Sequence, residues 1–245
     1  MKILVCLGQV PDTTSKISFT DNNTKLNPAG VQFIIGPYDE YALSKAIDLR
    51  EANGGTVTVF NVGLADAEPI IRKALAIGAD DAVRVDSEPS DALFVATQIA
   101  EYAKDKNFDM ILMGRESIDY NGGLVHGMVG EMLGIPSISP AMKLELDGSK
   151  AIISREIEGG KEVLEVPLPF VAGCQEPIAE WKIPNMRGIM SAKSKPLNVI
   201  ASFNSSQPVG HSGYELPTGR TSCKMIDAAN VEELVRLLKN EAKVI

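Results

Sequence analysis

Residues suited to binding an anion gather in one glycine-rich stretch. Residues 114–134 are G-R-E-S-I-D-Y-N-G-G-L-V-H-G-M-V-G-E-M-L-G. A strand pattern ends at Gly114, a loop follows, and a helix is predicted from Gly122 to Leu133. Glycines at a helix start leave backbone N–H groups accessible, and free amides and the helix dipole both favour a phosphate there. Gly122 and Gly123 are therefore a candidate phosphate site, although a simple tight turn between strand and helix explains the two glycines as well.

Side chains for acid–base, nucleophilic or metal chemistry are scarce. The chain has two histidines, His126 and His211. His126 falls within the predicted helix, where a packed or surface role is favoured, and His211 falls in a polar segment. Cys6 ends an apolar strand pattern and is expected to pack as a small hydrophobic residue. The sequence motifs of zinc proteases, P-loops, dithiol oxidoreductases and EF-hands are absent. The sequence therefore predicts neither a catalytic residue nor a metal site.

A second stretch suits contact with another protein. Residues 181–196 are W-K-I-P-N-M-R-G-I-M-S-A-K-S-K-P, with basic and apolar residues but no acidic one, in a chain of net charge -8. Apolar anchors rimmed by positive charge suit docking to an acidic protein surface. The alternative is a covered loop whose methionines pack into the body of the protein. The basic residues are Lys182, Arg187, Lys193 and Lys195, and the apolar ones are Ile183, Met186, Ile189 and Met190.

The elements that must position these stretches alternate between strand and helix. Strands are predicted at 2–7, 56–62, 82–85 and 110–113, with another apolar run at 31–35. Amphipathic helices are predicted at 39–53, between Asp66 and Gly78, and at 90–106. Such repeats require a parallel sheet covered on both faces, so the predicted fold is a doubly wound α/β sheet of the Rossmann-like, adenine-nucleotide-binding type. Ligands bind such sheets outside the carboxyl ends of the strands. The segments that lie there are 7–11, 36–39, 63–66 and 114–127.

The pattern changes after Pro136. Short strands around a turn at Gly159-Gly160 predict an antiparallel extension of the sheet. Periodicity is weak from Gln175 to about Asp227, which predicts a long arm that is either disordered or laid over a partner. A final helix is predicted at 230–243, capped by Asn230, and it either docks on a distant surface or packs back on the same domain. The expected organisation is a nucleotide-binding domain at 1–175, a recognition loop and arm at 176–227, and a terminal helical segment at 228–245.

Composition narrows the class of protein. Hydrophobic residues make up 44% and charged residues 23% of the chain, a balance typical of soluble globular proteins. The excess of 32 acidic over 24 basic residues disfavours a nucleic-acid-binding protein. No apolar run approaches the ~20 residues of a membrane span. The strand pattern that starts at Lys2 leaves no room for a signal peptide, and the cysteines Cys6, Cys174 and Cys223 match no zinc or disulfide spacing. These observations predict a cytoplasmic protein with free thiols.

Over most of residues 1–200 the chain resembles the beta, or small, subunit of an electron transfer flavoprotein. The most specific part is the run I-P-N-M-R-G-I-M-S-A-K-S-K-P at 183–196. The other matching motifs are Val5-Cys6 with Gln9-Val10-Pro11, Pro37 followed by Asp39-Glu40, A-L-A-I-G-A-D-D at 74–81, D-M-I-L-M-G-R-E-S-I-D at 109–119 and R-E-I-E-G-G at 155–160.

The resemblance implies a heterodimer with an alpha subunit that carries the redox-active FAD. It implies that the heterodimer accepts electrons from acyl-CoA dehydrogenases or related flavoproteins and passes them to a membrane quinone oxidoreductase. The beta subunit would hold AMP as a structural nucleotide, and its arm and terminal helix would lie on the alpha subunit. A second hypothesis is a bifurcating protein, in which a second FAD replaces AMP and reacts with NADH. A third is a stand-alone nucleotide-binding module of the same α/β layer. The motifs favour the simple carrier.

The resemblance also implies roles for single residues. Ile183 matches the anchor of a recognition loop that inserts into a pocket of the dehydrogenase. Tyr38 matches an aromatic residue near the alpha-subunit flavin, and Glu156 matches an acidic residue that pairs with an arginine of the mobile flavin domain. The candidate docking residues are Ile183, Pro184, Met186, Ile189, Met190 and Lys193. The candidate cofactor-binding residues are Cys6, Gly36, Tyr38, Val62, Gly63, Asn121, Gly122, Gly123, Val125, His126 and Gly127.

Two places depart from the family pattern. Gly36 stands where the family usually has asparagine before the proline. Leu124-Val125-His126-Gly127 replaces a nucleotide loop that usually reads close to Q-T-G-Q or Q-V-G-P. A threonine hydroxyl and a glycine amide that would contact phosphate are therefore missing or replaced. Either His126 supplies a different donor, or the nucleotide is absent or altered.

Overall fold

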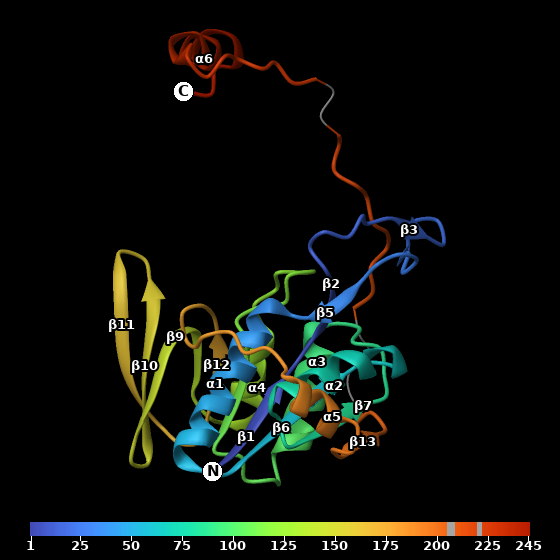
Figure 1. Cartoon of the computed structure of the whole chain (residues 1–245), viewed down its shortest axis with the longest axis vertical. Coiled ribbons are helices and arrows are strands. Elements are labelled where there is room, and N and C mark those ends of the chain that lie inside the picture. The colour runs from blue at the N-terminus through green and yellow to red at the C-terminus, as the bar shows by residue number, and fades with distance from the viewer. Residues whose placement is uncertain (205–208, 220–221) are drawn as a thin grey trace. The chain divides into compact units, whose positions relative to one another are not determined.

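The chain folds around one large sheet. The computed structural model describes residues 1–204, 209–219 and 222–245 (Figure 1). It divides into two compact units: Met1–Ile17 with Asn27–Ser212, and Ser18–Leu26 with Gly213–Ile245. In the described residues the first unit contains a nine-stranded sheet. No helix within those residues is both long and apolar enough to span a bilayer.

Most of the sheet is parallel, as the sequence predicts. Its order is β11-β10-β9-β12-β8-β1-β6-β7-β13. Every neighbouring pair from β9 to β13 is parallel, and the β10–β11 hairpin adds to β9 in antiparallel fashion. The strands are β1 Lys2–Cys6, β6 Thr56–Val62, β7 Asp81–Val85, β8 Met110–Gly114, β9 Ser137–Asp147, β10 Lys150–Ile157, β11 Gly160–Pro167, β12 Phe170–Cys174 and β13 Leu197–Ile200.

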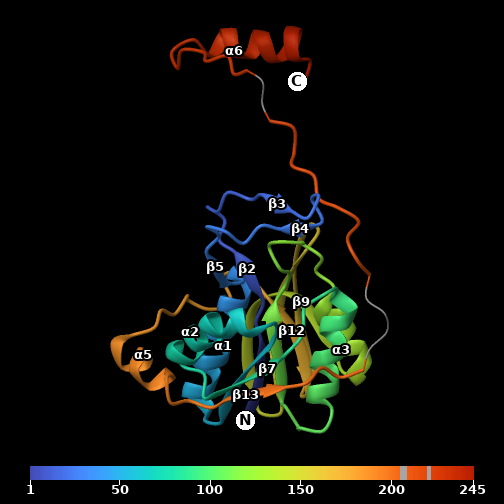
Figure 2. The same cartoon turned by 90° about the vertical axis from the view of Figure 1, so that its right-hand side faces the viewer.

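Helices cover both faces of the sheet. The strands alternate buried side chains between the faces, so that Ile3 and Val5 enter one core and Leu4 enters the other. Figure 2 views the sheet edge-on, with α1, α2 and α5 on one side and α3 on the other. This placement of helices on both faces of a mostly parallel sheet confirms the doubly wound α/β fold. The helices of this unit are α1 Pro37–Asn53, α2 Glu68–Ile77, α3 Ala92–Ala103, α4 Val125–Leu133 and α5 Met186–Ala192.

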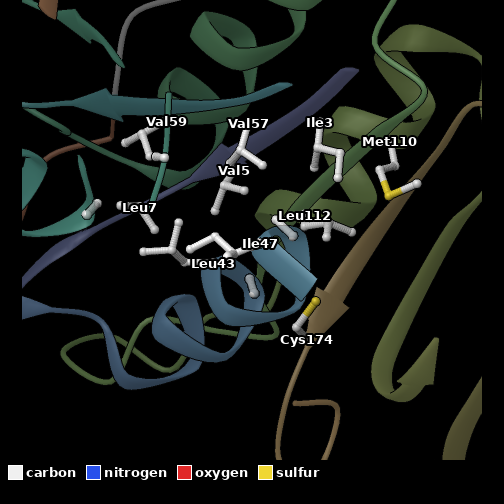
Figure 3. Packing of buried hydrophobic residues seen from close by; sticks show 14 of the residues in the cluster. Ile3, Val5, Leu7, Leu43, Ile47, Val57, Val59, Met110, Leu112 and Cys174 are labelled. Atoms are coloured by element: carbon white, nitrogen blue, oxygen red, sulfur yellow. The ribbon is translucent and has the colours of Figure 1, made fainter. Parts of the chain in front are cut away.

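The larger core lies between the sheet and helices α1 and α2. Leu43 and Ile47 of α1 point toward Val5, Val57 and other strand residues, and all four named residues are buried (Figure 3). Apolar burial contributes about 25 cal/mol per Å², so fully buried aliphatic residues of this kind supply most of the stabilising free energy.

The strand order reverses at β1. This strand pairs with β6 on one side and with β8 on the other. The chain builds outward through β6 and β7 and then crosses back to β8. In a doubly wound sheet the crossovers on the two sides of such a point leave a crevice at the carboxyl ends of the strands. Here those ends belong to β1 and β8.

Two strand predictions need correction. The antiparallel extension was expected to include all strands after Pro136, but β9 and β12 run parallel within the main sheet. Every residue of β12 is buried, as expected of a parallel strand covered on both faces. The apolar run at 31–35 contributes β5 (Phe33–Ile35), which pairs with β2 (Gln9–Pro11) in a separate two-stranded sheet.

The expectation of weak structure from Gln175 onward also needs correction. This stretch contains α5 and β13, and β13 extends the sheet beside β7. The backbone of Phe203 exchanges two hydrogen bonds with the buried amide of Gln98, at 2.7 and 3.1 Å. Such short elements depend on packing rather than on periodicity, so the sequence pattern does not reveal them. Residues 205–208 and 220–221 of the arm lie outside the described residues.

The second unit contains a hairpin and the terminal helix. The hairpin is formed by β3 (Phe19–Thr20) and β4 (Lys25–Leu26). The ring of Phe19 stacks on Tyr214 with centroids 5.1 Å apart, and the Tyr214 N–H donates to the Asn23 carbonyl at 2.7 Å. Helix α6 (Val231–Leu237) begins as predicted, because the Asn230 side chain accepts a hydrogen bond from the Glu233 N–H. A short π-helix, Leu238–Ala242, follows it.

The core predicts unequal costs for two leucine substitutions. Leu43→Ala removes a fully buried side chain of α1 and should lower the free energy of unfolding by about 2–5 kcal/mol. Leu93→Ala truncates a side chain of α3 that is 41% exposed, and should change it by only about 0.5 kcal/mol. Urea denaturation of the two variants measures the difference. Equal losses would contradict the assignment of the core.

Candidate functional site

A buried carboxylate joins the three segments that meet at the crevice. Asp39, in the first turn of α1, accepts hydrogen bonds from the Gly8 N–H at 2.8 Å and the Gly114 N–H at 2.7 Å. Gly8 follows β1 and Gly114 ends β8, so one side chain links both strand ends to the helix. A Cβ atom on Gly36 would lie 2.6 Å from Asp39 Oδ2. The glycine that departs from the family pattern therefore makes room for this carboxylate.

The environment of Asp39 opposes its ionisation. Burial raises the pKa of Asp39 to about 7, although the hydrogen bonds from Gly8 and Gly114 act in the opposite direction. The negative charges of Asp119 and Glu40 raise this pKa further. The link between the strands is consequently sensitive to pH near neutrality.

A cation lies beside this link. The Arg115 guanidinium is 4.8 Å from the centre of the Tyr38 ring. Its Nη1 donates to Gln175 Oε1 at 2.9 Å, and its Nη2 pairs with Glu116 Oε1 at 2.8 Å. Its Nε is buried and makes no hydrogen bond within the part of the chain that the structure describes. A buried donor of this kind suits an anionic ligand, which would supply the missing acceptor.

Helix α4 begins later than the sequence predicts. It starts at Val125 rather than Gly122, so Gly122 and Gly123 lie in the preceding loop. Asn121 and Gly123 have φ values of 50° and 58°, and these left-handed residues make a turn that delays the helix. The Met128 N–H makes the first helical bond, to the Leu124 carbonyl. The amides of residues 125–127, in the first turn, therefore have no acceptor within the helix, and these residues lie within the predicted cofactor loop.

His126 is half-buried at the start of α4. Burial lowers its pKa, although hydrogen bonding to the backbone of Arg115 and Gly123 opposes that change. A Cβ atom on Gly173 would lie 2.8 Å from the His126 ring. His126 also lines a depression of about 350 Å³. The other lining residues are Arg115, Glu116, Gly123, Ser139 and Pro140. His211 is not among these lining residues, and its ring stacks on Tyr120 with centroids 5.1 Å apart.

The remaining predicted cofactor residues lie one or two strands away, at the same edge of the sheet. Cys6 ends β1 and packs in the core, where burial raises the pKa of its thiol. Val62 and Gly63 end β6 and follow it. The neighbouring Asn61 is buried. Its Nδ2 donates to the Leu7 carbonyl, and its Oδ1 has no hydrogen-bond partner among the described residues.

Sequence reasoning missed the roles of Asp39, Arg115 and Asn61. Asp39 and Arg115 appeared only inside family motifs. The sequence signal for the role of Asp39 was an acidic residue two positions after a helix-starting proline, in a chain with glycines at the predicted strand ends. Neither the partner of a buried carboxylate nor an unpaired nitrogen can be read from spacing, because both depend on strand order.

The predicted docking residues are largely exposed. Ile183, Met186 and Met190 are 70%, 75% and 72% exposed. A depression of about 570 Å³ lies between α2 and α5, and Ile189, Pro184 and Lys193 are among its lining residues. The predicted interdomain residue Glu156 is exposed on β10, opposite Lys161 of β11.

The pKa of Asp39 predicts a pH dependence of stability. Between about pH 4 and pH 7 the unfolded carboxyl is ionised while the folded one keeps its proton, so the folded state loses stability as the pH rises through this range. Asp39→Asn removes this contribution. The difference in unfolding free energy between wild type and variant should therefore decline up to about pH 7 and then level off. Urea denaturation at several pH values measures it, and a rising difference would mean that the amide hydrogen bonds outweigh burial.

Comparison with known proteins shows the family of this chain. Residues 24–202 match the electron transfer flavoprotein domain. The chain is 35% identical over 259 residues to the electron transfer flavoprotein subunit beta of Bacillus subtilis, with all of both chains covered. It is 36% identical to the corresponding subunit of Syntrophomonas wolfei, covering 100% of this chain and 98% of the relative. It is also 34% identical to the acryloyl-CoA reductase electron transfer subunit gamma of Anaerotignum propionicum, covering 82% and 77% respectively. The chain therefore belongs to the electron transfer flavoprotein family, among its beta subunits.

Proposed function

We propose that this chain is the beta subunit of a heterodimeric electron carrier and holds AMP as a structural nucleotide at the carboxyl edge of its sheet. The observation that carries the nucleotide proposal is the buried Nε of Arg115, which has no hydrogen-bond partner among the described residues and belongs to a side chain that lines the same depression as Gly123 and His126. A fixed cation and free helix amides form a site for phosphate. The chain would work in the cytoplasm.

The residues present fit such a nucleotide. The amides of Val125, His126 and Gly127 would hold its phosphate, and a Cβ atom on Gly127 would meet no atom within 4 Å, so the approach is open. The base would lie toward Cys6, Val62 and Gly63, the neighbouring strand ends. Because burial lowers the pKa of His126, its ring would contact the nucleotide in the neutral form. The missing family threonine is thus replaced by backbone amides and Arg115.

The redox chemistry would come from the FAD of an alpha subunit, which accepts and releases electrons when bound. This chain would shape one side of that site. Tyr38 would face the flavin, and Arg115, stacked on the Tyr38 ring, would place a positive charge next to it. Asp39 would hold Tyr38 through α1 and Arg115 through the neighbouring Gly114. Gly114 also packs closely on Tyr38, since a Cβ atom on Gly114 would lie 2.7 Å from the Tyr38 Cβ. Glu156 would pair with an arginine of the mobile flavin domain.

We propose that the arm and α6 lie on the alpha subunit and that the docking residues contact a partner flavoprotein. The electron donor would be an acyl-CoA dehydrogenase or a related flavoprotein, and the acceptor a membrane quinone oxidoreductase. The name of the Anaerotignum relative, an acryloyl-CoA reductase electron transfer subunit, supports a partner that acts on acyl-CoA substrates. Electron transfer needs cofactor proximity and a docking surface rather than an acid, base or nucleophile in this chain.

Nucleotide analysis tests the cofactor proposal. The heterodimer should release one FAD and one AMP when denatured. Arg115→Met should lower the AMP content by weakening its affinity about tenfold, since a charge-assisted hydrogen bond to a buried group contributes about 1.5–3 kcal/mol. Arg187→Met, which removes an exposed guanidinium from α5, serves as the control and should leave both nucleotides unchanged. Two FAD and no AMP would instead indicate a bifurcating protein, and one FAD alone would mean that the site is empty.

Kinetics test the docking proposal. Ile183→Ala should raise the Michaelis constant of the partner dehydrogenase for this protein about tenfold, because an apolar anchor at an interface contributes about 1–2 kcal/mol. The nucleotide content should not change. Val199→Ala, at another exposed apolar position on β13, should have no effect. Unchanged kinetics for Ile183→Ala would exclude this residue as the anchor.

A further inference from the structure

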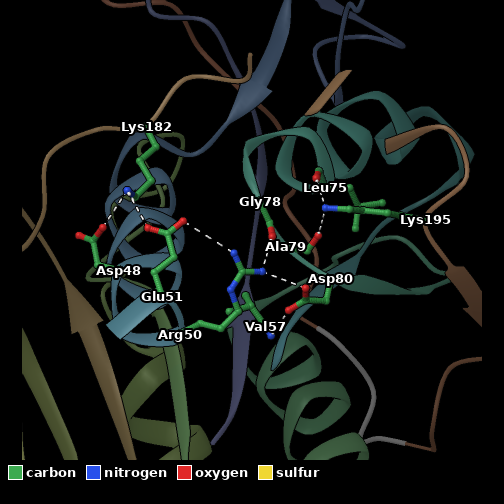
Figure 4. Close-up of polar contacts among 10 residues, drawn as sticks. All are labelled: Asp48, Arg50, Glu51, Val57, Leu75, Gly78, Ala79, Asp80, Lys182 and Lys195. Carbon is green, nitrogen blue, oxygen red and sulfur yellow. Dashed lines mark hydrogen bonds and ion pairs between the residues drawn. The ribbon is translucent and has the colours of Figure 1, made fainter. Parts of the chain in front are cut away.

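The docking segment, residues 181–196, is fixed to the body at its amino-terminal end. The Lys182 N–H donates to Ser44 Oγ of α1 at 3.1 Å. The Lys182 ammonium lies 2.8 Å from Asp48 and 3.8 Å from Glu51 (Figure 4). The preceding Trp181 ring receives the Lys73 ammonium at 5.9 Å from its centre.

The carboxyl-terminal end of the docking segment is held by the side chains of Lys195 and Arg72. Lys195 Nζ donates to the carbonyls of Leu75 and Ala79, at 2.9 and 2.6 Å, where α2 ends (Figure 4). These carbonyls lie at a helix terminus, where a cation is stabilising. Arg72 of α2 donates in return to the carbonyls of Ala192 and Lys195, at 3.0 and 2.9 Å. The end of α5 and the end of α2 therefore hold each other through backbone carbonyls.

Between these ends, α5 packs on α2 at very short range. A Cβ atom on Gly188 would lie 2.2 Å from the Ala76 carbonyl oxygen, so this contact requires glycine. Ala192 is buried in the larger core. Met186 and Met190 are exposed. The buried side of the segment thus attaches it, and the exposed side remains for a partner.

We propose that Arg72 and Lys195 are positioning residues that hold α5 in its docking conformation before a partner binds. This inference rests on the proposed docking function. Helix α5 has seven residues, too few for an isolated helix to be stable in water. Without the two cations, a partner would have to order the segment on binding and would lose affinity.

The same contacts define the charge of the partner surface. The sequence suggests four basic residues for an acidic partner, but Lys182 and Lys195 bind groups of their own chain. Arg187 and Lys193 have no ion pair among the described residues. The surface that fits is therefore an apolar pocket with about two acidic groups beside it, and docking should depend only moderately on salt.

Two lysines that are two positions apart provide a matched test. In the complete heterodimer with its flavin bound, Lys195→Met should increase hydrogen exchange of the amides in residues 186–192 about tenfold or more. It should also raise the Michaelis constant for the partner dehydrogenase several-fold while leaving kcat and the FAD content unchanged. Lys193→Met should leave the exchange unchanged, although it should raise the Michaelis constant at low salt and weaken its salt dependence, because Lys193 would face the partner. Lys195→Arg, which keeps the donors, should restore most of the affinity.

A second variant covers the case in which Lys195→Met does not fold. Gly188→Ala should displace α5 from Ala76, increase the exchange of residues 186–192 and raise the Michaelis constant. The proposal is overturned if Lys195→Met or Gly188→Ala leaves both the exchange of residues 186–192 and the Michaelis constant unchanged. It is also overturned if kcat or FAD content falls in parallel with affinity, because that result indicates general damage. If exchange rises but Ile183→Ala has no kinetic effect, the positioning is correct and the assignment of the partner surface is wrong.

Discussion

The crevice depends on one carboxylate held by two backbone amides. A parallel sheet that reverses its strand order leaves the ends of the two central strands splayed, and their backbone N–H groups need acceptors. Asp39 provides an acceptor for each strand from a single helical position. The glycines at positions 36 and 114 leave space for it, since a Cβ atom at either would lie less than 3 Å from its oxygens. Tyr38 precedes this carboxylate and Arg115 follows Gly114, so the contact brings both residues to the same strand end.

Helix α1 connects the crevice to the docking segment. Its first turn carries Asp39, while Ser44 and Asp48 further along the helix hold Lys182. Glu40 pairs with Lys73 at 2.5 Å, and Lys73 also lies over Trp181. The proposed nucleotide-binding edge and the proposed docking surface are thus connected through the same helix. A carrier benefits from such a scaffold, because electron transfer depends on a constant distance between cofactor and partner.

The chemistry of the site relies on backbone groups more than on reactive side chains. The first-turn amides of α4 and a buried guanidinium nitrogen with no hydrogen-bond partner among the described residues suit the binding of an anion. The docking segment follows the same pattern, since carbonyls at the ends of α2 and α5 are its main anchors. Backbone groups are present in any sequence that adopts the fold, which allows the surrounding side chains to vary.

The sequence by itself determined the α/β class, β6 and the cap of α6, because hydrophobic period and capping chemistry are local properties. It also indicated two candidate functional stretches and, by resemblance, identified the family. The tertiary structure decided which strands were parallel, where α4 begins and that 186–200 contains a helix and a strand. It decided as well that Asp39 and Arg115 belong to the site and that Lys182 and Lys195 face inward. These features depend on contacts between residues far apart in the chain, such as Lys195 with Leu75 and Asp39 with Gly114. No local pattern encodes those contacts, since they exist only once the strands have taken their order.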